Sequence, residues 1–191
     1  MLRKLCVIAA AAALVAAPLP SLAQGKKDSV VMGMTLEPPG LDPTNAAAAA
    51  IAEVTLYNVY ETLTKINEDG SVSPLLAESW QASPDLKTYT FKLRKGIKFH
   101  NGEPFDSAAV KFSFDRAAAP TSTNKDKSLY QAFASVTAPD PETVVVALKY
   151  SEPNLPFLLG QATGSIVEPK SAPTDATQPV GTGPYTLGSW A

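Results

Sequence analysis

The residue type best suited to acid-base or nucleophilic chemistry occurs once in this chain, as His100. A Ser/His/Asp triad could be built only around His100, which stands beside the turn signal Asn101-Gly102 and has no visible partner in the sequence. A metal site would need carboxylates to join this single imidazole, because the chain has no short-spaced pair of ligands. The pattern indicates a structural or solvent-exposed histidine. We therefore expect no catalytic residue, no metal site, no cofactor and no enzymatic activity.

Two further patterns fall short of ligand sites. Gly181-Thr182-Gly183 has the glycines of a phosphate-binding loop, but Pro184 follows where such a loop needs Lys and then Ser or Thr, so a tight turn is expected. A local basic cluster comprises Lys92, Arg94, Lys95 and Lys98. Apolar residues alternate with these cations, which favours the solvated face of a strand over an anion site.

The start of the chain predicts export. Arg3 and Lys4 precede an unbroken apolar run, residues 5–17, which is too short to span a bilayer and is typical of a secretory signal peptide. A small-residue cleavage site follows as Ser21-Leu22-Ala23. We expect a signal peptide over residues 1–23 and a protein that is released into the periplasm.

The mature chain, residues 24–191, is long enough for one domain. Cleavage removes the only cysteine, Cys6, which lies too early to become the lipid-bearing first residue of a lipoprotein, so no disulfide or thiolate site is expected. Loss of Arg3 and Lys4 lowers the basic count from 16 to 14 against 18 acidic residues, which gives a net charge of −4. A chain with this net negative charge lacks the excess of basic residues that binding to nucleic acid needs.

The first half of the mature chain predicts a strand, a loop and a helix. Ser29–Met34 is a short apolar segment that ends at the turn-rich Glu37–Gly40. A helix is expected from the alanine run at 46–50 onward, because apolar residues recur at helical spacing. These residues are Ala52, Leu56, Val59, Tyr60 and Leu63. We expect Tyr57 and Tyr60 to be core residues, with a ligand-facing role as the alternative.

The second half predicts strands mixed with helices. Residues 88–94 alternate strictly, as in a half-buried strand, and Asn101-Gly102 is a strong turn signal. Asp106 or Ser107 can cap a helix in which three apolar residues share a face. These three are Val110, Phe114 and Ala117. Residues 143–150 predict a strand whose continuous apolar run indicates burial on both faces. The fold class expected is α/β, or α+β mixed.

Several blocks of the chain resemble one protein family, in the order in which that family carries them. The main block runs from Pro74 to Phe114 and includes Pro-Leu-Leu-Ala-Glu-Ser-Trp and Lys-Thr-Tyr-Thr-Phe-Lys-Leu-Arg-Lys-Gly-Ile-Lys-Phe-His-Asn-Gly. The others are Leu41-Asp42-Pro43, Phe105 to Arg116, Glu152-Pro153-Asn154, Pro156-Phe157-Leu158 and Pro179 to Tyr185. Together they are similar to the family 5 extracytoplasmic solute-binding proteins, the receptors of peptide, nickel and opine ABC importers.

This resemblance implies a periplasmic binding protein-like type II fold of which residues 24–191 form the N-terminal part, an incomplete lobe I, since family members are usually well over twice as long. It implies a two-lobed clamp that closes on a peptide or similar small solute and delivers it to an inner-membrane ABC permease with its ATPase subunits. The sequence does not name the solute. Two alternatives stay open, a truncated interaction module without solute affinity and a periplasmic hydrolase built on His100.

The resemblance also points to candidate ligand contacts. In peptide-binding members the backbone after the Leu-Asp-Pro motif pairs with the ligand like an added strand. By position, the ligand-binding residues here are Thr44, Asn45, Ala46, Ala47 and Ala49. Small side chains suit the close approach of another backbone. The alternative is that the alanine run merely begins the helix.

Overall fold

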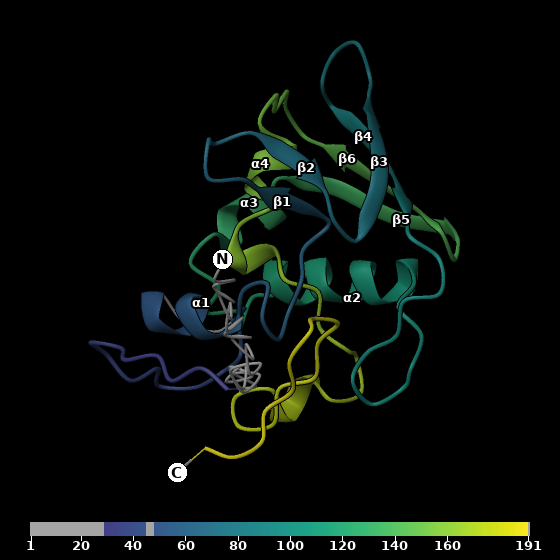
Figure 1. Ribbon diagram of the computed structural model, residues 1–191. Coiled ribbons are helices and arrows are strands. Elements are labelled where there is room, and N and C mark those ends of the chain that lie inside the picture. Colours follow the sequence, from purple (N-terminus) through teal and green to yellow (C-terminus); the bar gives the residue numbers. More distant parts are fainter. Residues whose placement is uncertain (1–28, 45–47, 191) are drawn as a thin grey trace, which may run out of the picture. The chain divides into compact units, whose positions relative to one another are not determined.

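Figure 1 shows the computed structural model, which describes residues 29–44 and 48–190. The chain falls into two compact units, Met1–Met34 and Thr35–Ala191, and every helix and strand among the described residues belongs to the second. The predicted strand at Ser29–Met34 is wrong, because these residues form neither helix nor strand. A strand needs a neighbour for its ladder of hydrogen bonds, and no described residue pairs with this segment. The predicted signal peptide lies outside the described residues.

An antiparallel sheet of four strands, in the order β3-β4-β6-β5, forms the centre of the second unit. The strands are β3 (Ala77–Ala82), β4 (Thr88–Leu93), β5 (Phe133–Asp140) and β6 (Thr143–Leu148). β4 confirms the predicted strand, since Tyr89, Phe91 and Leu93 are buried and the residues between them are not.

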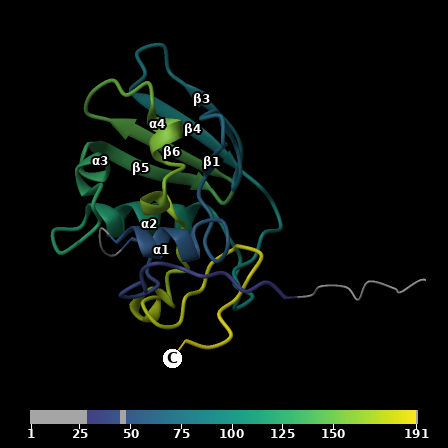
Figure 2. The same ribbon diagram turned by 60° about the vertical axis from the view of Figure 1, so that its left-hand side comes forward.

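Strand β6 confirms a second prediction only in part. Val144 and Val146 are buried, whereas Val145 is half-buried, so burial on both faces is wrong. The cause is the architecture, because an antiparallel sheet with its helices on one face leaves the other face closer to solvent. Figure 2 shows this layering, with α2 along one face of the sheet.

The helix that covers the sheet is α2 (Ser107–Ala118). Its start was predicted correctly, since the side chain of Asp106 accepts a hydrogen bond from the Ala109 N–H at 3.0 Å and caps the first turn. Val110, Phe114 and Ala117 are buried in the core, as expected. The remaining elements are smaller: the hairpin of β1 (Thr64–Ile66) and β2 (Val72–Pro74), α3 (Lys127–Gln131), α4 (Leu155–Leu158) and two 3₁₀ turns, η1 (Ala162–Gly164) and η2 (Ala172–Thr174).

Helix α1 (Ala49–Thr55) is shorter than the predicted helix, which was expected to reach Leu63. Tyr57 has a φ of 60°, in the left-handed region, so the helix cannot continue through it. A tertiary contact explains the early end, because the carbonyls that a longer helix would use are taken by a distant segment. The Gly183 N–H donates to the Val59 carbonyl and the Tyr185 N–H to the Asn58 carbonyl, both at 3.0 Å.

The two glycines of the predicted turn at 181–183 make this contact possible. A Cβ atom on Gly181 would lie 1.9 Å from the Val59 carbonyl oxygen, and one on Gly183 would lie 2.4 Å from the Asn58 carbonyl oxygen. The backbones therefore approach more closely than any other residue type would allow. This contact brings the end of the described chain beside the residues that follow α1.

Candidate functional site

The loop ahead of the predicted ligand segment is organised by Asp42. One oxygen of its carboxylate, Oδ1, accepts hydrogen bonds from the Thr44 N–H at 3.0 Å and from the Thr44 hydroxyl at 2.9 Å. Both residues are buried, and this short-range pattern fixes the turn around Pro43. The Leu41 N–H donates to the Ala176 carbonyl at 2.9 Å, so the loop is also attached to the segment after η2.

Arg116, in the last turn of α2, holds the same loop from the other side. Its guanidinium donates to Asp42 Oδ1 at 3.1 Å, and also to Asp42 Oδ2 and to the Thr44 hydroxyl. Such a two-pronged pair fixes orientation as well as charge. Burial opposes the charge on Arg116, but the hydrogen bonds and the charge of Asp42 outweigh it and raise the pKa of the guanidinium.

A second carboxylate, that of Asp175, is completely buried, and its charge interacts with those of Asp42 and Arg116. Its Oδ1 accepts one long hydrogen bond, 3.4 Å, from the Val180 N–H. The buried hydroxyl of Tyr60 interacts with this carboxylate, although neither that hydroxyl nor Oδ2 makes a well-formed hydrogen bond among the described residues. Burial, and then the neighbouring charge of Asp42, raise the pKa of Asp175 to about 6. Burial and the charge of Asp175 also raise the pKa of the Tyr60 phenol.

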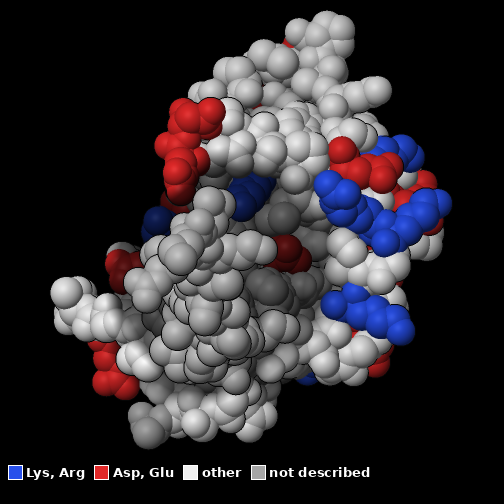
Figure 3. Space-filling model, viewed as in Figure 1, with Lys and Arg blue, Asp and Glu red and all other residues white. Residues whose placement is uncertain are grey.

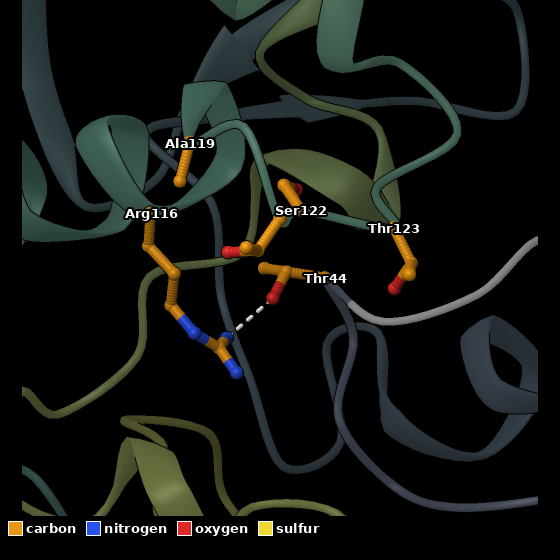
Figure 4. Close-up of a pocket in the computed structure, with 6 residues that line it drawn as sticks. Thr44, Arg116, Ala119, Ser122 and Thr123 are labelled. Atoms are coloured by element: carbon orange, nitrogen blue, oxygen red, sulfur yellow. Dashed lines mark hydrogen bonds between the residues drawn. The ribbon is translucent and has the colours of Figure 1, made fainter.

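A surface hollow of about 340 Å³ opens next to Arg116 and Thr44. Its wall is rich in hydroxyl groups, supplied by Thr44, Thr121, Ser122 and Thr123. Figure 4 shows Ser122 reaching towards Thr44 from the connection after α2, with Arg116 and Thr44 joined by a hydrogen bond. The lining offers hydrogen-bond donors and acceptors to a polar solute.

The five predicted ligand-binding residues differ in what the structure shows of them. Thr44 is buried, and its side chain is engaged by Asp42 and Arg116, so it shapes the loop. Ala49 is exposed and is the first residue of α1. The end of the alanine run therefore does begin a helix, which agrees with the alternative given for this segment. Asn45, Ala46 and Ala47 lie outside the described residues, and their role stays a prediction.

No local sequence pattern pointed to Arg116 and Asp175, which complete the charge cluster. Aspartate two residues before Thr44 is a recognisable turn pattern, and it points to Asp42 alone. Arg116 and Asp175 are 74 and 133 positions further along the chain. Only the packing of α2 and of the segment after η2 against the loop brings them together.

His100 has partners that the sequence did not reveal. The Gly181 N–H donates to its Nδ1 at 3.3 Å, so Nε2 carries the proton and donates to the Gly183 carbonyl at 2.8 Å. The His100 N–H also donates to the Gly181 carbonyl at 2.9 Å. The expectation that His100 has no partner is wrong, whereas the expected structural role is confirmed. Its ring holds the glycine segment in place.

The basic cluster is solvated, as predicted. Lys92, Arg94, Lys95 and Lys98 are exposed. Lys95 pairs with Glu142 at 2.8 Å, and Figure 3 shows Lys and Arg side chains with Asp and Glu close by on the face in view. Within residues 29–44 and 48–190 there is no cluster of three or more metal-ligating side chains, and no helix has the length and apolar character needed to cross a bilayer.

Comparison with known proteins connects the chain to curated relatives. Residues 71–191 match the family described as "Bacterial extracellular solute-binding proteins, family 5 Middle". The glutathione-binding protein GsiB of Shigella dysenteriae serotype 1 is 35% identical over 181 residues, which are 93% of this chain and 35% of that protein. GsiB of Escherichia coli K12 is 35% identical over 154 residues, 78% of this chain and 30% of that protein. The chain thus spans about a third of the length of these relatives.

Solved structures agree on the fold. The PBP AgaA of A. tumefaciens R10, in complex with agropinic acid, aligns with a TM-score of 0.75 and 30% identity over 81% of this chain and 32% of its own. OppA of Haemophilus influenzae, in complex with RPPGFSPFR, aligns with a TM-score of 0.74 and 26% identity over 81% of this chain and 34% of its own. The mixed helix and strand unit is therefore part of a periplasmic binding protein fold, as expected. With more than half of its residues matched, the chain belongs to the bacterial extracellular solute-binding proteins of family 5.

Proposed function

We propose that this chain is the substrate-binding component of an ABC importer, or the part of one that these residues represent, and that it captures peptides or a similar small solute. Family membership carries the proposal, supported by relatives that are glutathione-binding proteins and by a likeness to binding proteins holding agropinic acid and a peptide. The chain itself performs no reaction. It works in the periplasm after removal of residues 1–23, and residues 24–191 form part of one lobe.

The proposed mechanism is a two-lobed clamp. Solute binds between the lobes, and hinge closure buries it, which lets a few polar contacts set orientation while shape and apolar area set affinity. A solute shifts the equilibrium between the open and closed forms only to the extent that it binds one form more tightly than the other. The closed form is then recognised by an inner-membrane permease, whose ATPase subunits supply the energy for transport.

The proposed contact region is the backbone from Thr44 to Ala49. Ala48 has φ −76° and ψ 116°, so the chain is still extended immediately before α1 begins. An extended backbone with small side chains can pair with the main chain of a peptide, a mode that tolerates varied ligand side chains. The hydroxyl-rich hollow beside Thr44 and Arg116 adds polar groups near this segment.

Thermal unfolding of the complete gene product tests this function. Reduced glutathione, a set of tripeptides to nonapeptides and agropinic acid are each added over a range of concentrations. We expect one class of solute to raise Tm in a concentration-dependent way. At a solute concentration of about a hundred times Kd, the free energy of unfolding should increase by about 2.7 kcal/mol. A mixture of free glutamate, cysteine and glycine is the matched control for glutathione. Absence of any shift across all these solutes would reject the proposal.

A further inference from the structure

A second, smaller hollow lies beside the first turn of α1. Its volume is about 90 Å³, and most of its lining consists of small apolar side chains, among them Ala48, Ala49, Ala52 and Ala162. Of the described residues in this lining, Lys125 is the only charged one. The volume is well below the roughly 300–1,000 Å³ of a complete small-molecule site, so this alanine-lined hollow is suited to one end of a solute.

The backbone on both sides of Lys125 is fixed by hydrogen bonds. Asn124 is buried, and its side chain donates to the Thr163 carbonyl at 3.1 Å and accepts from the Asp126 N–H at 2.8 Å. The hydroxyl of Thr163 donates to the Asp126 carboxylate at 2.6 Å. A fully bonded network of this kind holds a surface connection in one geometry. When Lys125 binds a ligand, only its own side chain has to be ordered.

The ammonium group of Lys125 is available to an anion. No carboxylate of the described residues forms an ion pair with it, and the neighbouring Asp126 carboxylate is engaged by Thr163 instead. Arg116, the cation beside the hydroxyl-rich hollow, differs because Asp42 already neutralises its charge. Lys125 therefore has the positive charge that these two hollows leave unused.

The two hollows are built from the same two segments of the chain. The connection between α2 and α3, residues 119–126, supplies Thr121, Ser122 and Thr123 to the hydroxyl-rich hollow and Lys125 to the alanine-lined one. The loop before α1 supplies Thr44 to the first and Pro43 to the second. A polar surface and a cation thus lie next to each other. The arrangement suits a polar solute that has a negative charge at one end.

We propose that Lys125 is a carboxylate-binding residue of the solute site, and that the alanine-lined hollow receives a carboxylate group of the solute. The assignment to a solute rests on the proposed function. The apolar wall keeps water from one side of the ion pair, which makes the pair stronger than one that is fully exposed. In a peptide the carboxylate is that of the C-terminus or of an acidic side chain, and glutathione has one at each end.

Acetate tests the carboxylate site without any solute. In the complete gene product, isotope-labelled at the alanine methyl groups, the NMR signals of Ala48, Ala49, Ala52 and Ala162 report on the hollow. We expect sodium acetate to shift these signals saturably, relative to sodium chloride at the same ionic strength. Lys125→Gln should weaken the acetate affinity by a factor of about three or more, and Lys125→Arg should retain most of it.

Lys87→Gln is the matched control for this titration. Lys87 is exposed, loses the same charge on substitution and does not line the hollow. Its acetate affinity should equal that of the unaltered protein. Equal affinities in Lys125→Gln and Lys87→Gln, or no saturable shift in the unaltered protein, would overturn the proposal.

Calorimetry with reduced glutathione identifies the carboxylate that is bound. The ligands are glutathione itself, its glycinamide form and the form amidated at the glutamyl α-carboxylate. We expect Lys125→Gln to raise the Kd of glutathione about threefold to tenfold, and to leave unchanged the Kd of the one amide that lacks the bound carboxylate. If both amides respond to the substitution as glutathione does, Lys125 does not bind a carboxylate of this solute and the inference fails.

The two proposals fail in different ways. If glutathione binds equally well to Lys125→Gln and Lys87→Gln, the inference is overturned, whereas the proposed function stands. If acetate binds saturably and depends on Lys125 while no solute raises Tm in the thermal screen, the carboxylate site stands and the proposed function fails.

Discussion

Gly181 and Gly183 show how single atoms decide the local fold. A methyl group on Gly181 would meet the Val59 carbonyl oxygen at 1.9 Å, so Gly181→Ala must separate two backbone segments joined by hydrogen bonds. We expect it to lower the free energy of unfolding by about 3 kcal/mol, as overpacking does. Urea denaturation measures the loss. Gly188→Ala is the control, because nothing lies within 4 Å of a Cβ there. Similar losses in the two variants would contradict the close approach.

The raised pKa of Asp175 should make the stability of the protein depend on pH, with a sign that follows from the direction of the shift. Its pKa rises from 3.8 to about 6 on folding, so its stabilising contribution is fully present below 3.8 and is lost as the pH rises through about 6. At about 1.4 kcal/mol per pKa unit, the loss is about 3 kcal/mol. Urea denaturation across this range should show that loss in the unaltered protein relative to Asp175→Asn.

The control for this prediction is Asp85→Asn. The hydroxyl of Ser83, and then the Lys87 N–H, donate hydrogen bonds to Asp85 and lower its pKa from 3.8. Its contribution is therefore lost only as the pH falls below that value, the opposite direction. Between about pH 5 and about pH 7 its removal should leave the slope of stability unchanged. A slope in Asp175→Asn equal to that in Asp85→Asn would refute the role given to Asp175.

The limits of prediction at this scale follow from sequence separation. Asp42 could be singled out because a turn aspartate bonds to residues two positions away. Arg116, the other partner of Asp42, and the partners of the His100 ring lie more than 70 positions away, and no local pattern encodes them. The sequence therefore predicted a structural or solvent-exposed role for His100 without identifying the glycine segment that its ring holds.

At the scale of elements, the start of α2 depends on Asp106. Its carboxylate satisfies the Ala109 N–H, and Asp106→Ala leaves that donor without a partner. We expect a loss of about 1 kcal/mol in the free energy of unfolding, and Asp106→Ser should restore most of it. Asp115→Ala on the exposed face, which breaks the pair with Lys111, should cost less than about 0.5 kcal/mol. Chemical denaturation of the three variants decides whether the cap outweighs the surface pair.

Elements with a strong local pattern were predicted, and those that depend on neighbours were missed. The sequence of β4 alternates strictly, and that of α2 has both a cap and an apolar face, so each element could be predicted from its own residues. β3 and β5 are the outer strands of the sheet, mostly exposed, and their sequences show little alternation. α1 was predicted too long because its apolar spacing continues past Thr55, while the pairing of Asn58 and Val59 with the distant glycine segment ends the helix.

At the scale of the whole molecule, the proposed site has one wall among the described residues. The hollow beside Arg116 and Thr44 is open to solvent, whereas solute sites usually bury most of the ligand surface. The chain also spans about a third of the length of its curated relatives. In a two-lobed clamp, the second wall comes from the other lobe.

The last prediction therefore concerns these 191 residues expressed by themselves. With one wall, polar contacts stay hydrated and little apolar area is removed from water, so we expect reduced glutathione to bind with a Kd of about 1 mM or weaker. A form extended to the length of the relatives should bind at least about a hundredfold more tightly, a difference of about 2.7 kcal/mol. Calorimetry on both forms measures it, with circular dichroism as the control that the short form is folded. Micromolar binding by the short form would show that the loop, α1 and the hollow already make a complete site, and the clamp would then be unnecessary for affinity.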